Sequence, residues 1–176
     1  MTSKLKVEQI AHTNNVSAMT IDSSGRVNRS VIPSWRLKVS NTGNQELTSA
    51  GPHTITFQNL TAANTRCHLD GGCTLSGGIV TVPVTGTYAL NCAVRFNGVG
   101  SGYVLVQITI NGVATSVEEL YLIRGTSNHP GDYDTLAGST VMKLTANDNV
   151  RTTIYTSADT SYNVDGHSEF SGYLIG

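Results

Sequence analysis

The stretch that decides the fold closes the chain, where Gly138-Ser-Thr-Val-Met-Lys-Leu-Thr-Ala-Asn-Asp-Asn-Val150 is followed by Ser168-Glu-Phe-Ser-Gly-Tyr-Leu-Ile-Gly176. In the first segment, Asn147-Asp-Asn149 supplies residue types that tolerate the left-handed backbone of tight turns. In the second segment, Phe170 and Tyr173 are the large aromatic side chains. Together the two segments predict closing strands joined by turns. The last of these strands is expected to contribute to the core.

Short runs of alternating apolar and polar residues recur further upstream. Alternation with a period of two is typical of strands that bury one face. The runs are Trp35-Leu37-Val39, Ile55-Phe57, Val80-Val82-Val84 and Val104-Val106-Ile108-Ile110. Clusters of turn-forming residues such as Asn41-Thr-Gly-Asn44 lie between the runs, and no segment has a sustained helical stripe. Short strands at regular spacing predict an all-β fold, either a sandwich or a jelly roll.

Length and charge limit the function classes. The chain has 176 residues, the length of one domain with a sizeable core, and only 13% of them are charged, with a net charge of -1. So little surface charge is unusual for a free monomer, and closed symmetry is the usual way to cover faces with identical neighbours. We therefore expect an oligomer. The sequence has no stripe of basic residues that would favour binding to nucleic acid. It also has no apolar run that approaches the ~20 residues of a membrane span.

Two further blocks point to a family. Gly78-Ile-Val-Thr-Val-Pro-Val-Thr-Gly-Thr-Tyr-Ala-Leu90 contains an apolar strand, then Pro, then Gly-x-Tyr, and Tyr103-Val-Leu-Val-Gln-Ile-Thr-Ile-Asn-Gly-Val113 is a strand that ends in Asn-Gly. With the two closing segments, they resemble the C1q-like heads of the complement and tumour necrosis factor superfamily. The resemblance covers residues 33–176. It implies a homotrimeric jelly roll that binds and assembles but does not catalyse. The core or trimer positions that it implies are Trp35, Tyr88, Phe96, Phe170, Tyr173 and Leu174.

Residues 1–32 form a different module. Ser3-Lys-Leu-Lys-Val-Glu-Gln-Ile10 alternates briefly, and Ala18-Met-Thr-Ile-Asp-Ser-Ser-Gly-Arg-Val27 predicts a strand, a turn and the start of another strand. This segment has too little apolar area to fold alone, and it lacks the apolar region of a secretory signal. We predict a short β stem that becomes ordered against partner chains.

The pattern of the stem is similar to the opening of tail-fibre and virion-surface proteins of marine and freshwater bacteriophages. The residues that carry this resemblance, and that would attach the chain to the particle, include Leu5, Val7, Ile10, Met19 and Ile21. The absence of a Gly-x-y collagen stalk, common in the animal proteins, supports the phage interpretation. An animal-type secreted ligand is disfavoured for the same reason and because the signal sequence is missing.

The two resemblances together imply two alternative roles on a virion assembled in the host cytoplasm. In the first, the chain is a surface fibre or spike adhesin whose stem binds a tail or baseplate protein and whose head recognises a host-surface glycan or protein. In the second, it is a capsid decoration protein whose trimers sit on the shell and bind the major capsid protein. The fibre-type stem favours the first role, and the short chain favours the second.

Two loops carry the candidate binding residues. Asn128-His-Pro-Gly-Asp-Tyr-Asp134 and Asp159-Thr-Ser-Tyr-Asn-Val-Asp165, with His167 beyond, combine carboxylates, aromatic rings and imidazoles. Ordinary solvated loops need the same Pro, Gly and Asp residues, and this is the preferred interpretation, with a glycan or calcium site as the alternative. The candidates on these exposed loops are His129, Asp132, Tyr133, Asp134, Asp159, Tyr162, Asp165 and His167.

Cysteine chemistry and catalysis are the remaining possibilities. Cys67-His-Leu-Asp-Gly-Gly-Cys73 could ligate zinc or close a disulfide, but thiols packed as small hydrophobic groups, with Cys92 facing inward on a strand, are preferred. The sequence contains no Gly-x-Ser-x-Gly elbow, no His-Glu-x-x-His pair and no phosphate loop. Asp132 and Asp134 lie too close together on a loop to act as a glycosidase pair. We expect no catalytic residue, no metal and no cofactor.

Overall fold

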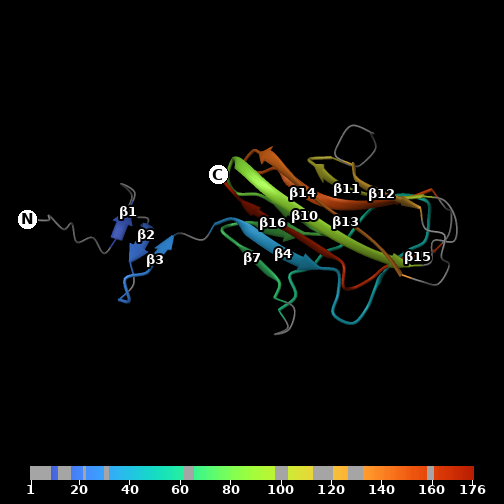
Figure 1. Cartoon of the computed structure of the whole chain (residues 1–176), viewed down its shortest axis with the longest axis horizontal. Coiled ribbons are helices and arrows are strands. Elements are labelled where there is room, and N and C mark those ends of the chain that lie inside the picture. Colours follow the sequence, from blue (N-terminus) through green and yellow to red (C-terminus); the bar gives the residue numbers. More distant parts are fainter. Residues whose placement is uncertain are drawn as a thin grey trace, which may run out of the picture. The chain divides into compact units, whose positions relative to one another are not determined.

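The chain divides into two compact units, Met1–Ile32 and Pro33–Gly176. The computed structural model (Figure 1) describes residues 9–11, 17–21, 23–29, 32–61, 66–97, 103–112, 121–126, 133–157 and 161–176. All regular elements among these residues are β-strands, and all of their pairings are antiparallel. We call the second unit the head.

The first unit contains a small antiparallel sheet. Its described strands, in the order β1-β2-β3, are β1 (Gln9–Ala11), β2 (Ser17–Ile21) and β3 (Val27–Arg29). Gly25, between β2 and β3, has a φ of 76°, a left-handed conformation that glycine adopts without strain. The predicted strand, turn and strand are therefore confirmed. Ile21 is exposed, whereas Leu5 and Val7 lie outside the described residues.

The first sheet of the head contains seven described strands. They are β4 (Ser34–Lys38), β5 (Gln45–Leu47), β7 (His68–Asp70), β10 (Gly86–Asn97), β13 (Tyr133–Leu144), β15 (Tyr162–Val164) and β16 (Glu169–Leu174). Their order is β5-β15-β10-β16-β4-β7. Strands β15 and β16 both pair with one edge of β10, and β13 pairs with the opposite edge along the whole length of β10.

The second sheet lies behind the first in Figure 1 and contains six described strands. They are β6 (Gly51–Thr54), β8 (Thr74–Ser76), β9 (Ile79–Thr81), β11 (Tyr103–Ile110), β12 (Tyr121–Thr126) and β14 (Asn149–Thr156). The order is β12-β11-β14-β9-β8, and β6 also pairs with β14. The two sheets enclose one core, which confirms the predicted jelly-roll sandwich.

Aromatic rings from several strands fill this core. The ring centroid of Phe170 lies 5.6 Å from that of Trp35 and 5.7 Å from that of Phe57, and Trp35 also contacts Tyr88. Burial of one such side chain contributes roughly 1.5–3 kcal/mol. Of the predicted core or trimer positions, Trp35, Tyr88, Phe96 and Phe170 are fully buried in the core, and Leu174 packs partly buried against them.

Two apolar positions lie outside the core: Tyr173, predicted as a core or trimer position, and Val84, predicted to continue a buried alternation. Tyr173 does not fill the core of the chain, because it alternates with the buried Gly172 on β16 and points outward, with 51% of its surface exposed. Val84 does not continue the buried alternation of Val80 and Val82. The strand β9 ends at Thr81, before Pro83, and Val84 is exposed in the connection to β10.

The cysteines behave as packed thiols. Cys73 and Cys92 are free and buried, and burial raises the pKa of Cys73 to about 11 and that of Cys92 to about 12. Cys67 is half-buried. At neutral pH the two buried sulfurs are therefore protonated, which favours packing over nucleophilic chemistry.

Candidate functional site

Two neighbouring segments of the chain each leave the seven-stranded sheet and rejoin it, at the same height along the strands. β16 and β15 run in succession along one edge of β10, and the chain leaves that edge between Val164 and Glu169. On their other side, β4 pairs with β16 and β5 pairs with β15, and the chain leaves the sheet between Lys38 and Gln45. Such insertions re-aim side chains, and they are frequent beside functional sites.

Specific hydrogen bonds hold the first insertion against β10. The backbone N–H of Asp165 donates to the carbonyl oxygen of Arg95 at 2.8 Å. The hydroxyl of Ser168 donates to that same oxygen at 3.1 Å and accepts from the N–H of Arg95 at 3.0 Å. The side chain of Ser168 thus replaces the backbone partner that a regular strand would offer to Arg95.

The second insertion packs directly on the first. The N–H of Ser40 donates to the carbonyl oxygen of Gly166 at 3.2 Å, and the N–H of Gly166 donates to the side-chain oxygen of Asn44 at 3.2 Å. A Cβ atom on Gly166 would collide with the carbonyl oxygen of Gly43 and lie 2.9 Å from that of Ser40. Only glycine therefore allows this close approach.

A polar cavity of about 240 Å³ lies between the two insertions. It is lined by Asn41, Thr42, Gly43, Asn44, Asp165, Gly166 and His167. The cavity follows the end of β4 at Lys38, whereas Pro33 precedes the start of β4 and accepts a hydrogen bond from Leu174 near the C-terminus. It therefore lies at the end of the head opposite Pro33, the end where β15 is labelled in Figure 1. We call this the distal cavity.

Charged side chains border the distal cavity. The side chain of Asp165 is only 9% exposed, and its Oδ1 atom accepts from the backbone N–H of His167 at 2.8 Å. The same oxygen lies 2.8 Å from Nδ1 of His167 and 3.8 Å from Nη1 of Arg95, whose guanidinium stacks 4.0 Å from the ring centroid of Tyr133. This cation–π contact and ion pair join strands β10 and β13 to the first insertion.

The pKa of Asp165 reflects these contacts. Burial by itself would raise it, but the hydrogen bonds from the backbone and ring of His167, together with the charge of Arg95, outweigh burial and leave the pKa below its ordinary value. Asp165 is therefore ionised at neutral pH. A buried carboxylate that is already bonded through one oxygen can accept further hydrogen bonds through the other.

The structure brings together residues from both predicted loops. Tyr133 from the first loop and Asp165 and His167 from the second meet around Arg95. Asp134, next to Tyr133 on β13, is half-buried, and its Oδ2 atom has no hydrogen-bond partner. The predicted candidates His129, Asp132 and Asp159 lie outside the described residues.

Four of the candidates are not on an exposed loop as predicted. Tyr133 and Asp134 are the first residues of strand β13, where Asp134 is half-buried. Tyr162 is buried on β15, because residues 162–164 pair with β5 and β10 rather than remaining in the loop. Asp165 is buried beneath the turn that follows β15. Conversely, sequence reasoning missed Arg95. Its only signal was its place between the apolar Val94 and Phe96, which puts a charge on the outer face of a strand.

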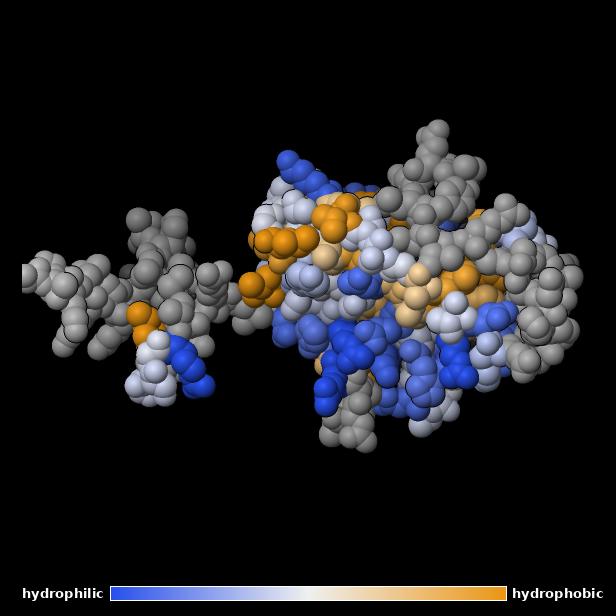
Figure 2. All heavy atoms as spheres, viewed as in Figure 1, coloured by the Kyte–Doolittle hydropathy of each residue, from blue (hydrophilic) through white to orange (hydrophobic). Residues whose placement is uncertain are grey.

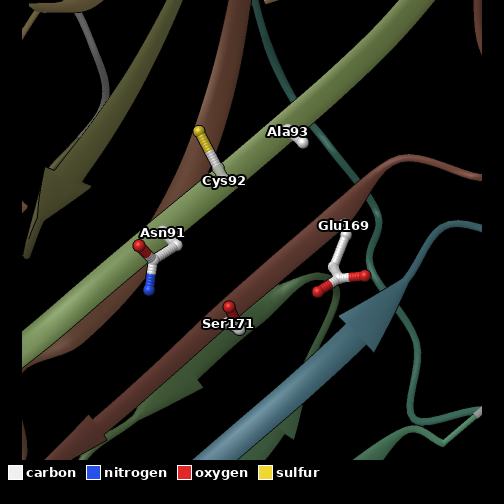
Figure 3. A pocket seen from close by; sticks show the side chains of 5 residues that line it. All are labelled: Asn91, Cys92, Ala93, Glu169 and Ser171. Atoms are coloured by element: carbon white, nitrogen blue, oxygen red, sulfur yellow. The ribbon is translucent and has the colours of Figure 1, made fainter. Parts of the chain in front are cut away.

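The outer face of the seven-stranded sheet carries a second depression, of about 90 Å³. Figure 3 shows Asn91, Ala93, Ser171 and Glu169 around it, with the thiol of Cys92 directed to the opposite side of β10 from Asn91. Glu169 accepts two hydrogen bonds from Arg36, at 2.8 and 2.6 Å, and these bonds lower its pKa. The depression is shallow and small side chains line it, so this face is better suited to packing against another protein surface than to enclosing a ligand.

Apolar side chains extend this face toward the C-terminus. Val141, Ala89 and Tyr173 lie side by side in the registers of β13, β10 and β16, and Val141 is 62% exposed. Figure 2 shows hydrophobic surface at the end of the head where Figure 1 marks the C-terminus. We call Val141, Ala89 and Tyr173 the apolar row. It lies toward the other end of the sheet from the distal cavity.

A comparison with protein families decides the identity of this fold. The model of the C1q domain matches residues 39–175, most of the chain. The chain belongs to the C1q domain family. C1q domains typically form trimers that recognise ligands, and the family is generally non-enzymatic. The match begins after β4 and leaves the N-terminal unit outside.

The other comparisons add limits. No curated protein gives a significant match to this C1q-domain chain. Within the described residues, no group of three or more His, Cys, Asp or Glu side chains is arranged to hold a metal ion, so Cys67, His68 and Cys73 do not form such a group. In the same part of the chain, no helix has the length and apolar character needed to cross a membrane.

Proposed function

We propose that this chain is a homotrimeric, non-enzymatic bacteriophage surface adhesin, mounted on the virion through residues 1–32. Assembled in the host cytoplasm, it displays its C1q head on the particle for recognition of a host-surface glycan or protein. The observation that carries the proposal is the position of the distal cavity and its charged border, at the end of the head opposite Pro33. A head tethered through its Pro33 end keeps that opposite end available for a ligand.

The outer face of the seven-stranded sheet has the features expected of an interface between copies of the chain, which supports the proposal of a trimer. The small side chains of Ala93 and Ser171 allow close approach of another surface, and the apolar row leaves hydrophobic area exposed in the single chain. Contiguous exposed apolar surface commonly marks a protein interface. We therefore assign this face to contacts between copies of the chain.

Replacing Val141 by Asp is expected to convert the trimer to monomers without unfolding the head. A buried, unpaired carboxylate at an interface is strongly unfavourable, whereas the same group on an exposed strand of a monomer costs little. Sedimentation would measure the mass, and thermal unfolding the integrity of the fold. Val84→Asp is the matched control, since Val84 is also exposed but lies outside the apolar row. A V141D protein that remains trimeric would show that this face is not the interface.

Electron microscopy of intact particles with gold-labelled antibody against the head tests the location. Label on a tail fibre or baseplate is the expected result. Label distributed over the capsid shell would overturn the adhesin role and favour the decoration role, in which residues 1–32 bind capsid subunits. Particles without label would overturn a virion role altogether. Binding of the purified protein to host cells, with competition by host polysaccharide, is the matching functional measurement.

A further inference from the structure

The distal cavity has polar groups that the fold itself leaves available. In the described part of the chain, the side chains of Asn41 and Thr42 have no hydrogen-bond partner, and both line the cavity. The Oδ1 atom of Asp165 carries the contacts to His167 and Arg95, so Oδ2 remains to accept from a ligand. The wall thus offers an amide, a hydroxyl and a carboxylate within one cavity.

Hydrogen bonds and close backbone packing hold the two insertions together without a ligand. The side-chain oxygen of Asn44 is held by Gly166, and the hydroxyl of Ser40 accepts from the N–H groups of Thr42 and Gly43 at 3.2 and 3.1 Å. The packing of Gly166 against Gly43 fixes the distance between the two insertions. A backbone frame held in this way does not have to reorganise on binding, which favours affinity for a small ligand.

The chemistry of the lining selects a neutral ligand with many hydroxyl groups. Each hydroxyl can both donate and accept, so it matches an amide on one side and a carboxylate on the other. An anion would meet the charge of Asp165, and the guanidinium of Arg95, 3.8 Å from that carboxylate, is already engaged with Asp165 and Tyr133. Calcium prefers about six to eight oxygen ligands, usually with several carboxylates, whereas the lining of this cavity includes one carboxylate, that of Asp165.

The volume suits a ligand of one ring. Water occupies about 30 Å³ per molecule in the liquid, so a cavity of about 240 Å³ has room for a compact polyol as large as several waters. We propose that the distal cavity binds the terminal ring of a neutral saccharide, with Asn41 and Asp165 as its hydrogen-bonding side chains. This inference deepens the proposed host recognition, on which it rests, by naming the ligand class and the residues.

Saturation-transfer NMR on the full-length protein tests the inference directly. The probes are free glucose, galactose, mannose and N-acetylglucosamine, each without added metal and with EDTA present. We expect ring-proton signals from at least one sugar, and we expect Asn41→Ala to weaken its binding at least ~tenfold through loss of paired hydrogen bonds. Asn59→Ala is the matched control, because Asn59 is exposed on a loop that does not line the cavity.

A second variant keeps the test independent of stability. Asp165→Asn should abolish binding but also removes native contacts, so its folding is checked by thermal unfolding, whereas Asn41 makes no contact that the fold needs. The inference is overturned if no sugar binds, if the Asn41→Ala protein binds as well as wild type, or if the cavity instead binds calcium. Adhesion to host cells that survives Asn41→Ala would overturn the saccharide site and leave the adhesin role standing. If the protein binds a sugar but the antibody against its head labels no particles, the adhesin role is overturned and the saccharide site stands.

Discussion

Replacing Phe170 by alanine is expected to lower the free energy of unfolding by about 3–5 kcal/mol and to leave no soluble trimer. Phe170 is fully buried on β16, and its ring contacts both Trp35 and Phe57. Its loss would leave a cavity between the two sheets that these rigid aromatic neighbours cannot fill. Domains of this size are stable by only about 5–15 kcal/mol, so the variant would lose a large part of that margin. Urea unfolding and sedimentation would measure the two effects.

Tyr173→Ala is the matched control, because it removes an aromatic side chain from the same strand, but on the outer face. We expect it to leave the free energy of unfolding of the head nearly unchanged and to weaken only the contact between copies. A Phe170→Ala protein that unfolds like wild type and remains fully trimeric would contradict the central place of this ring in the core.

The core could be predicted from the sequence because burial on a strand is a local property. Alternation alone placed Trp35, Leu37 and Val39 inside, and the chain's own pairings then bury them. The exceptions have local physical causes. Val84 follows a proline that lacks an N–H donor, so β9 stops before it, and Tyr173 continues the alternation of its strand toward the outside.

The candidate site could be predicted only in part, because it depends on pairing between distant segments. Residues 41–44 had the composition of a turn and nothing more. They become the wall of a cavity because β4 and β5 pair with β16 and β15, more than a hundred residues away, and both chains leave the sheet at the same level. Tyr162 was misplaced for the same reason, since its pairing with β5 was not readable from local pattern.

The arrangement of the head separates the proposed assembly face from the proposed recognition site. The apolar row lies toward the C-terminal end of the seven-stranded sheet, and the charged border around Arg95 lies at the distal end of the same strand β10. A ligand at the distal cavity therefore need not compete with a neighbouring copy packed on the apolar row. This separation is what a trimeric adhesin requires, and it makes the two sets of variants independent tests.

Replacing Gly78 by alanine is expected to lower the free energy of unfolding by about 2–4 kcal/mol. Gly78 is buried in the turn between β8 and β9, with a φ of 81°. A Cβ atom there would collide with the carbonyl oxygen of Ile55 and lie 2.9 Å from Cα of Thr56 and 3.0 Å from N of Phe57. These are backbone atoms, so no side-chain rotation relieves the clash, and the segment that carries Ile55 and Phe57 must move out of the core.

Gly77→Ala separates the clash from backbone strain. Gly77 has a φ of 56°, also in the left-handed region, but a Cβ atom there has no other atom within 4 Å. It should therefore lose only the strain energy, about 1–2 kcal/mol. Chemical denaturation of the two variants, compared with wild type, gives the contribution of the clash as their difference. Equal losses in the two proteins would mean that the 55–57 segment moves freely, and that Phe57 is not fixed in the core by the backbone beneath Gly78.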